Sequence, residues 1–379
     1  MGGRETVIAR TTTCNLTSSC YLGIDHSSDQ VSPWTNVTNG RPASLEATPG
    51  TEELSRRLAD LVGCERVVIA SSTLHLFWDL FGCLADREST ILMDSNIYPV
   101  ARWGVERAAG LGVSVRIFQH HDPLDLQSQV HRVINDGHRP IVVTDGFCAL
   151  CGCPAPIAAY LDAIDEFGGQ LILDDTQALG ILGSSPSESQ PYGLGGGGSL
   201  RSNSIANSNV IVVSSLAKGF GVPIACMAGS QRLIDWFLTR SETRSACSQP
   251  CRPVIHAAEH ALWVNQTDGE QLRSLLSDNV RHFQTRLREM GIAIDAGLFP
   301  VQAIPPIPGV NAQQMNAKLN ESGIQTVLID RHDTEDFGLG CLITANHVPT
   351  DLDLVAEAIA NAIATLLGGT IDTDSMQPS

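Results

Sequence analysis

The chain has little positive charge and no long apolar run. It contains 24 Lys and Arg residues against 41 Asp and Glu residues, which gives a formal net charge of −17 at pH 7. The field of the whole protein would repel nucleic acids and anionic membranes, and this excludes both as main partners. No segment approaches the roughly 20 apolar residues that cross a bilayer. We therefore expect a soluble protein that binds a small molecule.

A secretory signal and a disulfide framework are also lacking. No positively charged region precedes an apolar stretch at the start of the chain. The 11 cysteines are odd in number in a large chain, unlike the even sets of small secreted proteins. Cys148, Cys151 and Cys153 in FCALCGCPAP are closely spaced, but C-x2-C-x-C matches no usual zinc pattern. The sequence thus predicts a cytosolic protein with free thiols and no metal site.

The chain does contain an alternation of strand-like and helix-like segments. From Thr51, TEELSRRLADLVG places Leu54, Leu58, Leu61 and Val62 on one face and predicts a helix with Thr51 as its N-cap. Six β-rich apolar runs then alternate with helix-like segments: RVVIAS, TILMD, VSVRIF, PIVVTD, QLILDD and NVIVVSS. This order predicts an α/β fold with a mainly parallel sheet covered by helices on both faces.

The remaining segments set the expected domain organisation. The Gly/Ser/Asn-rich stretch 184–209 is expected to be a long mobile loop, either a lid or a passive insertion. A long helical pattern from about Val254 to Met290 leads into a smaller α/β unit with strand-like runs near 301–306, 324–329 and 339–344 and a closing helix near 350–366. We predict five parts: an N-terminal segment (1–50) that begins with a surface or intersubunit arm, a large domain (51–252), a connecting long helix (253–290), a small C-terminal domain (291–366) and a disordered tail (367–379).

Four features that carry chemistry fall on the ends of successive predicted strands, where open α/β sheets bind their ligands. Ser72-Thr73-Leu74 lies where RVVIAS turns into a helix, so free N–H groups and the helix dipole can hold a phosphate. Tyr98 follows TILMD, where its ring could stack on a flat heteroaromatic cofactor. A lone tyrosine is more often a core or rim residue, so Tyr98 gains weight only beside the other features.

The third and fourth features are acidic and basic strand ends. QLILDD ends in Asp174 and Asp175, and a buried carboxylate is costly unless it is paired. A protonated pyridine nitrogen would be such a partner and would keep the ring cationic as an electron sink. VVSSLAKGFG leads to Lys218 in a chain with very few lysines. Enclosure would lower the pKa of Lys218 and leave a nucleophilic amine that can form an imine.

Together these residues resemble the α-oxoamine synthase branch (8-amino-7-oxononanoate synthase-like) of the fold-type-I pyridoxal-phosphate (PLP) transferases, within the class I and II aminotransferase superfamily. The likeness covers roughly residues 20–365. CYLGIDH (20–26) is similar to the family's NYLGLS run, LDDTQALGILG (173–183) to its VDDAHGTGVLG run, and SSLAKGFG (214–221) to its TxSKAFG lysine motif. The resemblance implies a large PLP-binding domain and a smaller C-terminal α/β domain.

The resemblance also implies roles for single residues. Lys218 would carry PLP as a Schiff base, and Asp174 would pair with the pyridine nitrogen. Tyr98 takes the position of the family's stacking histidine, and Gln177 takes that of the histidine that contacts the phenolic oxygen. A glutamine can still form hydrogen bonds but does not titrate.

Phosphate binding and subunit assembly follow from the same resemblance. The backbone of Thr73 and Leu74 and the Ser215 hydroxyl would bind the phosphate. Ser248 in SACSQP matches the residue that reaches the phosphate from the other subunit, so the resemblance implies a homodimer with a shared active site. Cys148 lies where the family has a serine and would line the pocket. His75, next to the phosphate turn, would project toward the cofactor or pack in its helix.

Two family features are missing. TNGRPASLEATPG lacks the Gly-rich GSGGSR segment associated with the acyl-CoA substrate. In GLGCLITANH, Gly338 and Gly340 stand where the family has an arginine that grips the amino-acid carboxylate, and bidentate recognition needs a guanidinium. Arg331, in the preceding loop, is a candidate replacement, although a solvated loop arginine is the more usual case.

The function predicted from these residues is that of a PLP-dependent transferase. An amino acid or amine would displace Lys218 to give an external aldimine, and the freed amine would act as general acid and base. The leading reaction is decarboxylative condensation of an amino acid with an acyl thioester. The alternatives are an aminotransferase, or another PLP reaction, on an unusual amine or ketone in specialised metabolism, and a PLP-binding protein without catalysis.

Overall fold

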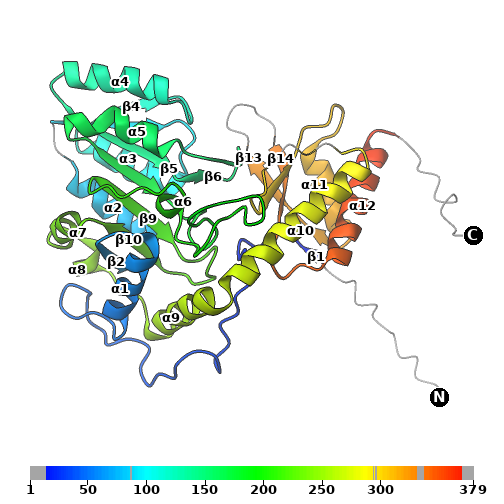
Figure 1. The fold of residues 1–379 in the computed structure, drawn as a ribbon, viewed down its shortest axis with the longest axis horizontal. Coiled ribbons are helices and arrows are strands. Elements are labelled where there is room, and N and C mark those ends of the chain that lie inside the picture. The colour runs from blue at the N-terminus through cyan, green and yellow to red at the C-terminus, as the bar shows by residue number, and fades with distance from the viewer. Residues whose placement is uncertain (1–13, 86–87, 293, 295–296, 331–336, 369–379) are drawn as a thin grey trace, which may run out of the picture. The chain divides into compact units, whose positions relative to one another are not determined.

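The structure is a computed structural model that describes residues 14–85, 88–292, 294, 297–330 and 337–368 (Figure 1). Contacts group residues 19–277 into one unit, the large unit, and the described residues before 19 and after 277 into a second, the small unit. The five-part division of the chain remains a prediction. Most of the predicted arm (residues 1–13) and tail (369–379) lies outside the described residues. Within the described part of the chain, no helix combines the length and apolarity that crossing a membrane requires.

The large unit is built on a seven-stranded sheet in the order β2-β10-β9-β8-β5-β3-β4 (Figure 1). All neighbours are parallel except for β10, which runs antiparallel to β2 and β9. The six predicted runs form six of its strands, which confirms the mainly parallel sheet. The bounds of the seven strands are β2 Arg66–Ala70, β3 Ser89–Asp94, β4 Ser114–Phe118, β5 Arg139–Asp145, β8 Gln170–Asp174, β9 Val210–Ser215 and β10 Ala225–Gly229.

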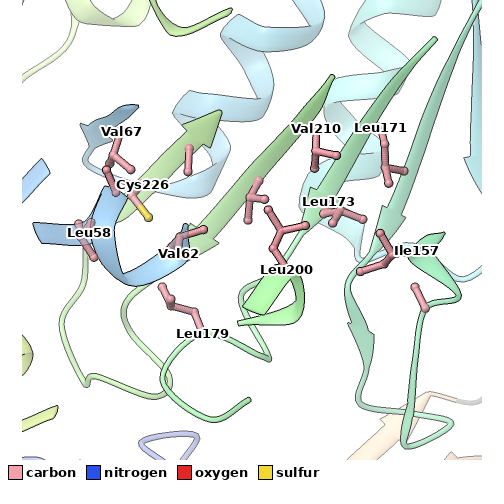
Figure 2. Close-up of a cluster of buried hydrophobic side chains, with 14 of the residues drawn as sticks. Leu58, Val62, Val67, Ile157, Leu171, Leu173, Leu179, Leu200, Val210 and Cys226 are labelled. Carbon is pink, nitrogen blue, oxygen red and sulfur yellow. The ribbon is translucent and has the colours of Figure 1, made fainter. Parts of the chain in front are cut away.

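Successive side chains of the central strands enter two different cores. Leu171, Leu173 and Val210 belong to one cluster, whereas Ile172 and Ile211 belong to the other. Because side chains alternate along a strand, continuous apolar runs need cover on both faces. Figure 2 shows part of the first cluster, where strand residues lie near side chains of helices: Leu58, Val62, Val67, Ile157, Leu171, Leu173, Leu179, Leu200, Val210 and Cys226.

Helices provide that cover. Residues of α1, α4, α5 and α9 pack in the first cluster, and residues of α2, α3 and α7 pack in the second. The helices of the large unit are α1 Thr51–Val62, α2 Thr73–Cys83, α3 Pro99–Gly110, α4 Pro123–Asn135, α5 Ile157–Ile164, the 3-10 helix Asp165–Phe167, α6 Ser199–Ser202, α7 Gln231–Leu238, α8 Thr243–Ala246 and α9 Arg252–Thr267. A short hairpin of β6 (Phe147–Cys148) and β7 (Cys153–Pro154) follows β5.

Two helix predictions need correction. Thr51 is the first helical residue of α1 and not its cap, because the left-handed Gly50 occupies the N-cap position. The predicted long helix is two helices, α9 and α10 (Gly269–Glu289), which are separated at Asp268. A Cβ atom at position 269 would lie 2.9 Å from Asn265 Oδ1 and 2.7 Å from Arg273 Nη2. Because Gly269 has no Cβ atom, the side chains of Asn265 and Arg273 can pack against the backbone where the two helices meet.

The segment 184–209 is held to the large unit by hydrogen bonds, and this corrects the expectation of a free mobile loop. Ser184 and Leu194 form a bridge, and Leu179 bridges Gly197. The Gly195 N–H donates to Glu270 at 2.7 Å, and its carbonyl accepts from Asn265 at 3.0 Å. The segment also contains α6. Its glycines therefore provide close backbone packing.

The small unit contains the second predicted α/β element. Its three-stranded antiparallel sheet has the order β11-β14-β13, and a two-residue strand near the N-terminus, β1, runs parallel to β12. The predicted strand runs and closing helix are confirmed. The bounds are β1 Cys14–Asn15, β11 Val301–Ile304, α11 Ala312–Glu321, β12 Ile324–Gln325, β13 Val327–Asp330, β14 Phe337–Leu342 and α12 Pro349–Leu366.

Candidate active site

Lys218 lies in a tight loop between β9 and β10. The Leu216 N–H donates to the Ile224 carbonyl at 2.8 Å, and the Val222 N–H donates to the Leu216 carbonyl at 3.1 Å. Gly219 permits this path, since a Cβ atom there would lie 2.5 Å from the Leu179 carbonyl oxygen. Burial lowers the pKa of Lys218, while the charges of Asp174 and Asp145 act in the opposite direction. The loop thus presents an amine whose neutral form is favoured by its surroundings.

The two adjacent carboxylates of QLILDD face different surroundings. Asp174 interacts electrostatically with Lys218, and its Oδ1 accepts from the Thr176 N–H at 3.0 Å. Asp175 accepts from the Ser199 N–H at 2.9 Å, so it anchors α6. Burial raises the pKa of both groups, that of Asp175 to about 7. The structure therefore separates a site carboxylate, Asp174, from a structural one, Asp175.

A third carboxylate, Asp145, was missed from the sequence. It ends β5 in register with Asp174 on β8, and its Oδ1 accepts from the Tyr98 N–H at 3.2 Å. Burial, and then the charge of Asp174, raise its pKa well above the ordinary value. The signal was present in PIVVTD, an apolar strand that ends in a carboxylate exactly as QLILDD does.

The predicted phosphate turn is the N-terminus of α2. Ser72 is its N-cap residue, and the N–H groups of Thr73 and Leu74 have no acceptor inside the helix. Ser72 Oγ lies 2.8 Å from His75 Nδ1, so His75 contacts the cap residue. Ser71 Oγ donates to the carbonyl of Ser248 at 2.9 Å. Ser248 therefore lies beside the phosphate turn of its own chain, with its side chain exposed.

Ser215 is the last residue of β9, and Gln177 follows the neighbouring strand β8. The Ser215 N–H donates to Thr176 Oγ1 at 3.0 Å, and Ser215 Oγ accepts from the Ala217 N–H at 3.2 Å. The buried Tyr21, from the CYLGIDH run, donates its hydroxyl to Gln177 Oε1 at 2.9 Å. Because Gln177 Oε1 accepts this bond, the side-chain N–H groups of Gln177 remain available to donate to a ligand.

Tyr98 stands at the start of α3, just after β3, and 48% of its surface is exposed. Its ring is thus available to a ligand while its backbone is held by Asp145. Cys148 is buried in β6 and belongs to a separate group of cysteine and histidine side chains considered below. His120 and His121, in the turn after β4, belong to that group and are partly exposed.

The residues present fit PLP. Among the described residues, Thr176 alone donates hydrogen bonds to the carboxylate of Asp174, so this buried group can accept a further donor such as a pyridinium N–H. A helix N-terminus suits a phosphate, and Lys218 supplies an amine for the aldehyde. All three features come from the large unit.

The positions where the resemblance would place a carboxylate-binding arginine lie in the small unit, on β14. A Cβ atom on Gly340 would lie 2.9 Å from Val327 Cγ2 and would also meet Ile329, so β13 fills the space that a longer side chain would need. Gly338 lines a groove with residues 304–313. Arg331 lies outside the described residues.

Comparisons with known proteins agree with this site. The model of the family "Aminotransferase class I and II" matches residues 36–359. The 8-amino-7-oxononanoate synthase of Klebsiella pneumoniae (strain 342) is 26% identical over 361 residues, which cover 91% of this chain and 88% of the relative. The enzyme of the same name from Halorhodospira halophila is 27% identical over 324 residues, with 83% and 75% covered.

Solved structures share the fold. The Sphingomonas wittichii serine palmitoyltransferase superposes with a TM-score of 0.81 at 17% identity and covers 94% of this chain and 89% of its own. The Francisella tularensis 8-amino-7-oxononanoate synthase gives 0.71 at 18% identity, with 93% and 98% covered. A further structure, described as SPT with its PLP internal aldimine, gives 0.80 at 17% identity, with 93% and 88% covered. These similarities confirm the predicted fold class.

Proposed function

This chain belongs to the aminotransferase class I and II family, and from this premise we propose that it is a PLP-dependent transferase that condenses an amino acid with an acyl thioester. The synthase relatives place it in the α-oxoamine synthase branch, as its motifs predict. In the proposed reaction the amino acid loses its carboxylate as CO2, its α-carbon bonds to the acyl carbon, and the thiol leaves. The product is an aminoketone.

The observation that carries this proposal is that Lys218, Asp174 and the start of α2 follow strands of one sheet at the same edge. Lys218 and Asp174 lie at the ends of the neighbouring strands β9 and β8, and α2 follows β2, which is separated from β9 by β10. PLP, when bound, supplies an aldehyde that reacts with amines and a ring that accepts electrons. Asp174 would hold the proton of the ring nitrogen. Lys218, whose pKa is lowered by burial, would move a proton to and from the substrate α-carbon.

The other cofactor contacts extend from the same strand ends. The N–H groups of Thr73 and Leu74 and the Ser215 hydroxyl would bind the phosphate, and Tyr98 would cover one face of the ring. Gln177, oriented by Tyr21, would donate an N–H to the phenolic oxygen. Because an amide does not titrate, this contact would be independent of pH.

The proposal includes a cytosolic homodimer with a shared active site. Large apolar side chains are exposed on α2 and α3, which pack against each other next to the phosphate turn: Leu74 (42% exposed), Trp78 (44%) and Trp103 (50%). Exposed apolar groups gathered on one face are typical of a covered surface. The resemblance would have Ser248 reach the partner's phosphate, although Ser248 also lies beside the phosphate turn of its own chain. Light scattering on the purified protein tests the subunit number.

The lysine assignment can be tested by borohydride reduction, which fixes PLP covalently to the amine that holds it. Peptide mass mapping should place the label on Lys218. The matched control is Lys318→Ala, which removes a lysine of the small unit's α11 and should leave the label unchanged. Lys218→Ala should abolish it. A label that persists in Lys218→Ala would refute the assignment.

The reaction is tested separately, with a panel of amino acids and acyl-CoA thioesters. Release of CO2 and free thiol that requires both substrates supports condensation. If an amino acid alone converts the cofactor to one equivalent of pyridoxamine phosphate, and an added keto acid restores PLP, the protein is an aminotransferase. The second outcome would be informative, because Gly338 and Gly340 stand where the family has the arginine that binds the substrate carboxylate.

A further inference from the structure

A group of sulfur and nitrogen atoms lies outside the residues assigned to PLP. We call it the Cys–His cluster: Cys148, Cys151, His120 and His121, with Asp94 behind the histidines. One ligand atom each from Cys148, Cys151 and His120 lies within 4.8 Å of the other two. The same is true of Asp94, His120 and His121. These residues come from β3, the loop after β4 and the hairpin after β5, so the sheet brings together side chains that are distant in sequence.

The β6–β7 hairpin positions the two sulfur atoms. Cys148 pairs with Cys153 across the hairpin, and the Gly152 N–H donates to the Cys148 carbonyl at 2.9 Å. Gly152 has a φ of 69°, a conformation that favours glycine. The turn places Cys151 Sγ 3.9 Å from the Cys148 carbonyl oxygen. Cys148 is buried and Cys151 is exposed.

His120 is oriented toward the sulfur atoms by a buried carboxylate. Its Nδ1 lies 2.7 Å from Asp94 Oδ1, and its Nε2 lies 3.4 Å from Cys151 Sγ. Asp94 is in turn held by the Asn96 N–H at 2.9 Å and the Thr144 hydroxyl at 3.1 Å. A carboxylate on one ring nitrogen that fixes the other for a metal ion is a recurrent arrangement in metalloproteins.

His121 adds a second imidazole beside the first. Its ring stacks on that of His120 with centroids 3.8 Å apart, and its Nδ1 lies 3.9 Å from Cys151 Sγ. The Nε2 atom of His121 is buried and has no hydrogen-bond partner among the described residues. The backbone of His121 has a φ of 54°, which is uncommon for residues other than glycine. Strained conformations of this kind persist where the surroundings impose them.

We propose that the Cys–His cluster binds one zinc-class divalent cation through Cys148 Sγ, Cys151 Sγ and His120 Nε2, since these three side chains have ligand atoms within 4.8 Å of one another. His121 Nδ1, 3.9 Å from Cys151 Sγ, would be the fourth ligand. Two thiolates and two imidazoles are a ligand set that selects zinc over magnesium or calcium. With Zn–S bonds of about 2.3 Å and Zn–N bonds of about 2.0 Å, neighbouring ligands of a tetrahedron lie about 3.5 Å apart. The separations of 3.4 and 3.9 Å are close to this value.

The site would be structural. Four protein ligands leave no open position for a substrate. The ion would fasten the β6–β7 hairpin to the loop after β4, three residues beyond Asp145. Of these four residues, only Cys148 is expected from the resemblance to line the PLP pocket. This inference stands apart from the proposed function, because no contact in the proposed reaction uses any of the four.

The test is metal analysis of the full chain, purified without chelators from zinc-supplemented cells. We expect about one zinc ion per chain by elemental (inductively coupled plasma) mass spectrometry. After removal of zinc, added Co²⁺ should give the visible bands of tetrahedral cobalt and a thiolate-to-cobalt charge-transfer band. Cys151→Ser and His120→Ala should each weaken binding of Co²⁺ at least tenfold.

Two controls keep the outcome interpretable. Cys153 is exposed, and its thiol contacts the Cys151 carbonyl oxygen at 3.4 Å, so Cys153→Ser should bind metal as the parent does. Lys218→Ala should also keep its metal, which separates this site from the PLP assignment. The circular dichroism spectrum of each variant reports its folding. Cobalt bands that are absent from the parent, or unchanged in a folded Cys151→Ser protein, would overturn the proposal. So would a Cys148–Cys151 disulfide in parent protein that binds no Co²⁺.

Discussion

The neighbouring carboxylates Asp174 and Asp175 offer a sharp test of the structure. Asp175 is 1% exposed, and burial raises its pKa from 3.8 to about 7. The folded protein therefore keeps the Asp175 proton over a pH range in which the unfolded chain releases it. Below pH 3.8 this group costs the fold nothing, and above about pH 7 the full cost is present. The contribution of Asp175 to stability thus falls as pH rises.

Asp175→Asn removes this titration while keeping an oxygen that can accept from the Ser199 N–H. One pKa unit corresponds to about 1.4 kcal/mol, so the cost of ionising Asp175 grows by about 2.5 kcal/mol between pH 5 and pH 8. The stability of the variant relative to the parent should increase by that amount over this range. In a thermal melt this is about 5 °C if the large unit unfolds cooperatively.

The assay is a series of melting curves for parent and Asp175→Asn at half-unit steps from pH 5 to pH 8. The difference between the two proteins isolates Asp175, since all other groups titrate in both. Asp60→Asn, at an exposed carboxylate of α1, is the matched control for the same change of residue type. A constant difference for Asp175→Asn would refute the assignment of a buried, proton-binding carboxyl at this position.

Three further predictions concern the cofactor loop and its neighbours. Gly219→Ala should destabilise the fold by about 1–3 kcal/mol in urea unfolding and reduce the cofactor absorbance, because its methyl group would collide with the Leu179 carbonyl. Gly110→Ala is the control: a Cβ atom at position 110 meets open space, so neither the stability nor the absorbance should change. Tyr98→Ala should weaken PLP binding by about 0.5–1.5 kcal/mol, whereas Tyr98→Phe should retain the stacking face; equal losses in a PLP titration would argue against stacking. Tyr21→Phe should lower the free energy of unfolding in urea by about 1 kcal/mol, since the hydrogen bond to Gln177 is lost. If Gln177 contacts PLP, the same variant should shift the cofactor absorbance, and an unchanged spectrum would contradict that contact.

The parallel sheet was predictable because its strands are continuous apolar runs. Ile172 and its neighbours Leu171 and Leu173 enter opposite cores, which leaves no polar face to interrupt the pattern. Strand β10 escaped prediction because ACMAG lacks β-branched residues, and its place depends on pairing with both β2 and β9. Such pairing is a tertiary effect that local composition does not contain.

The same distinction explains the site. Lys218 and Asp174 each follow a strand directly, so local sequence indicates their position at the edge of the sheet. Asp145 follows a strand in the same way and could have been found by the same criterion. The Cys–His cluster could not, because its geometry depends on the order of β3, β4 and β5 in the sheet and on the turn of a short hairpin. The spacing of Cys148, Cys151 and Cys153 alone does not reveal that His120 lies beside Cys151.

The structure also shows what surrounds Gly340 on β14. Val327 and Ile329 of β13 occupy the space beside Gly340, so an arginine at this position would require the sheet to repack. Placing an arginine at this position would therefore need changes at Val327 and Ile329 as well. An enzyme with this sheet must bind a substrate carboxylate through another group, or act on an amine that has none. The substrate panel that tests condensation should for this reason contain simple amines as well as amino acids, because the two readings differ in whether CO2 is released.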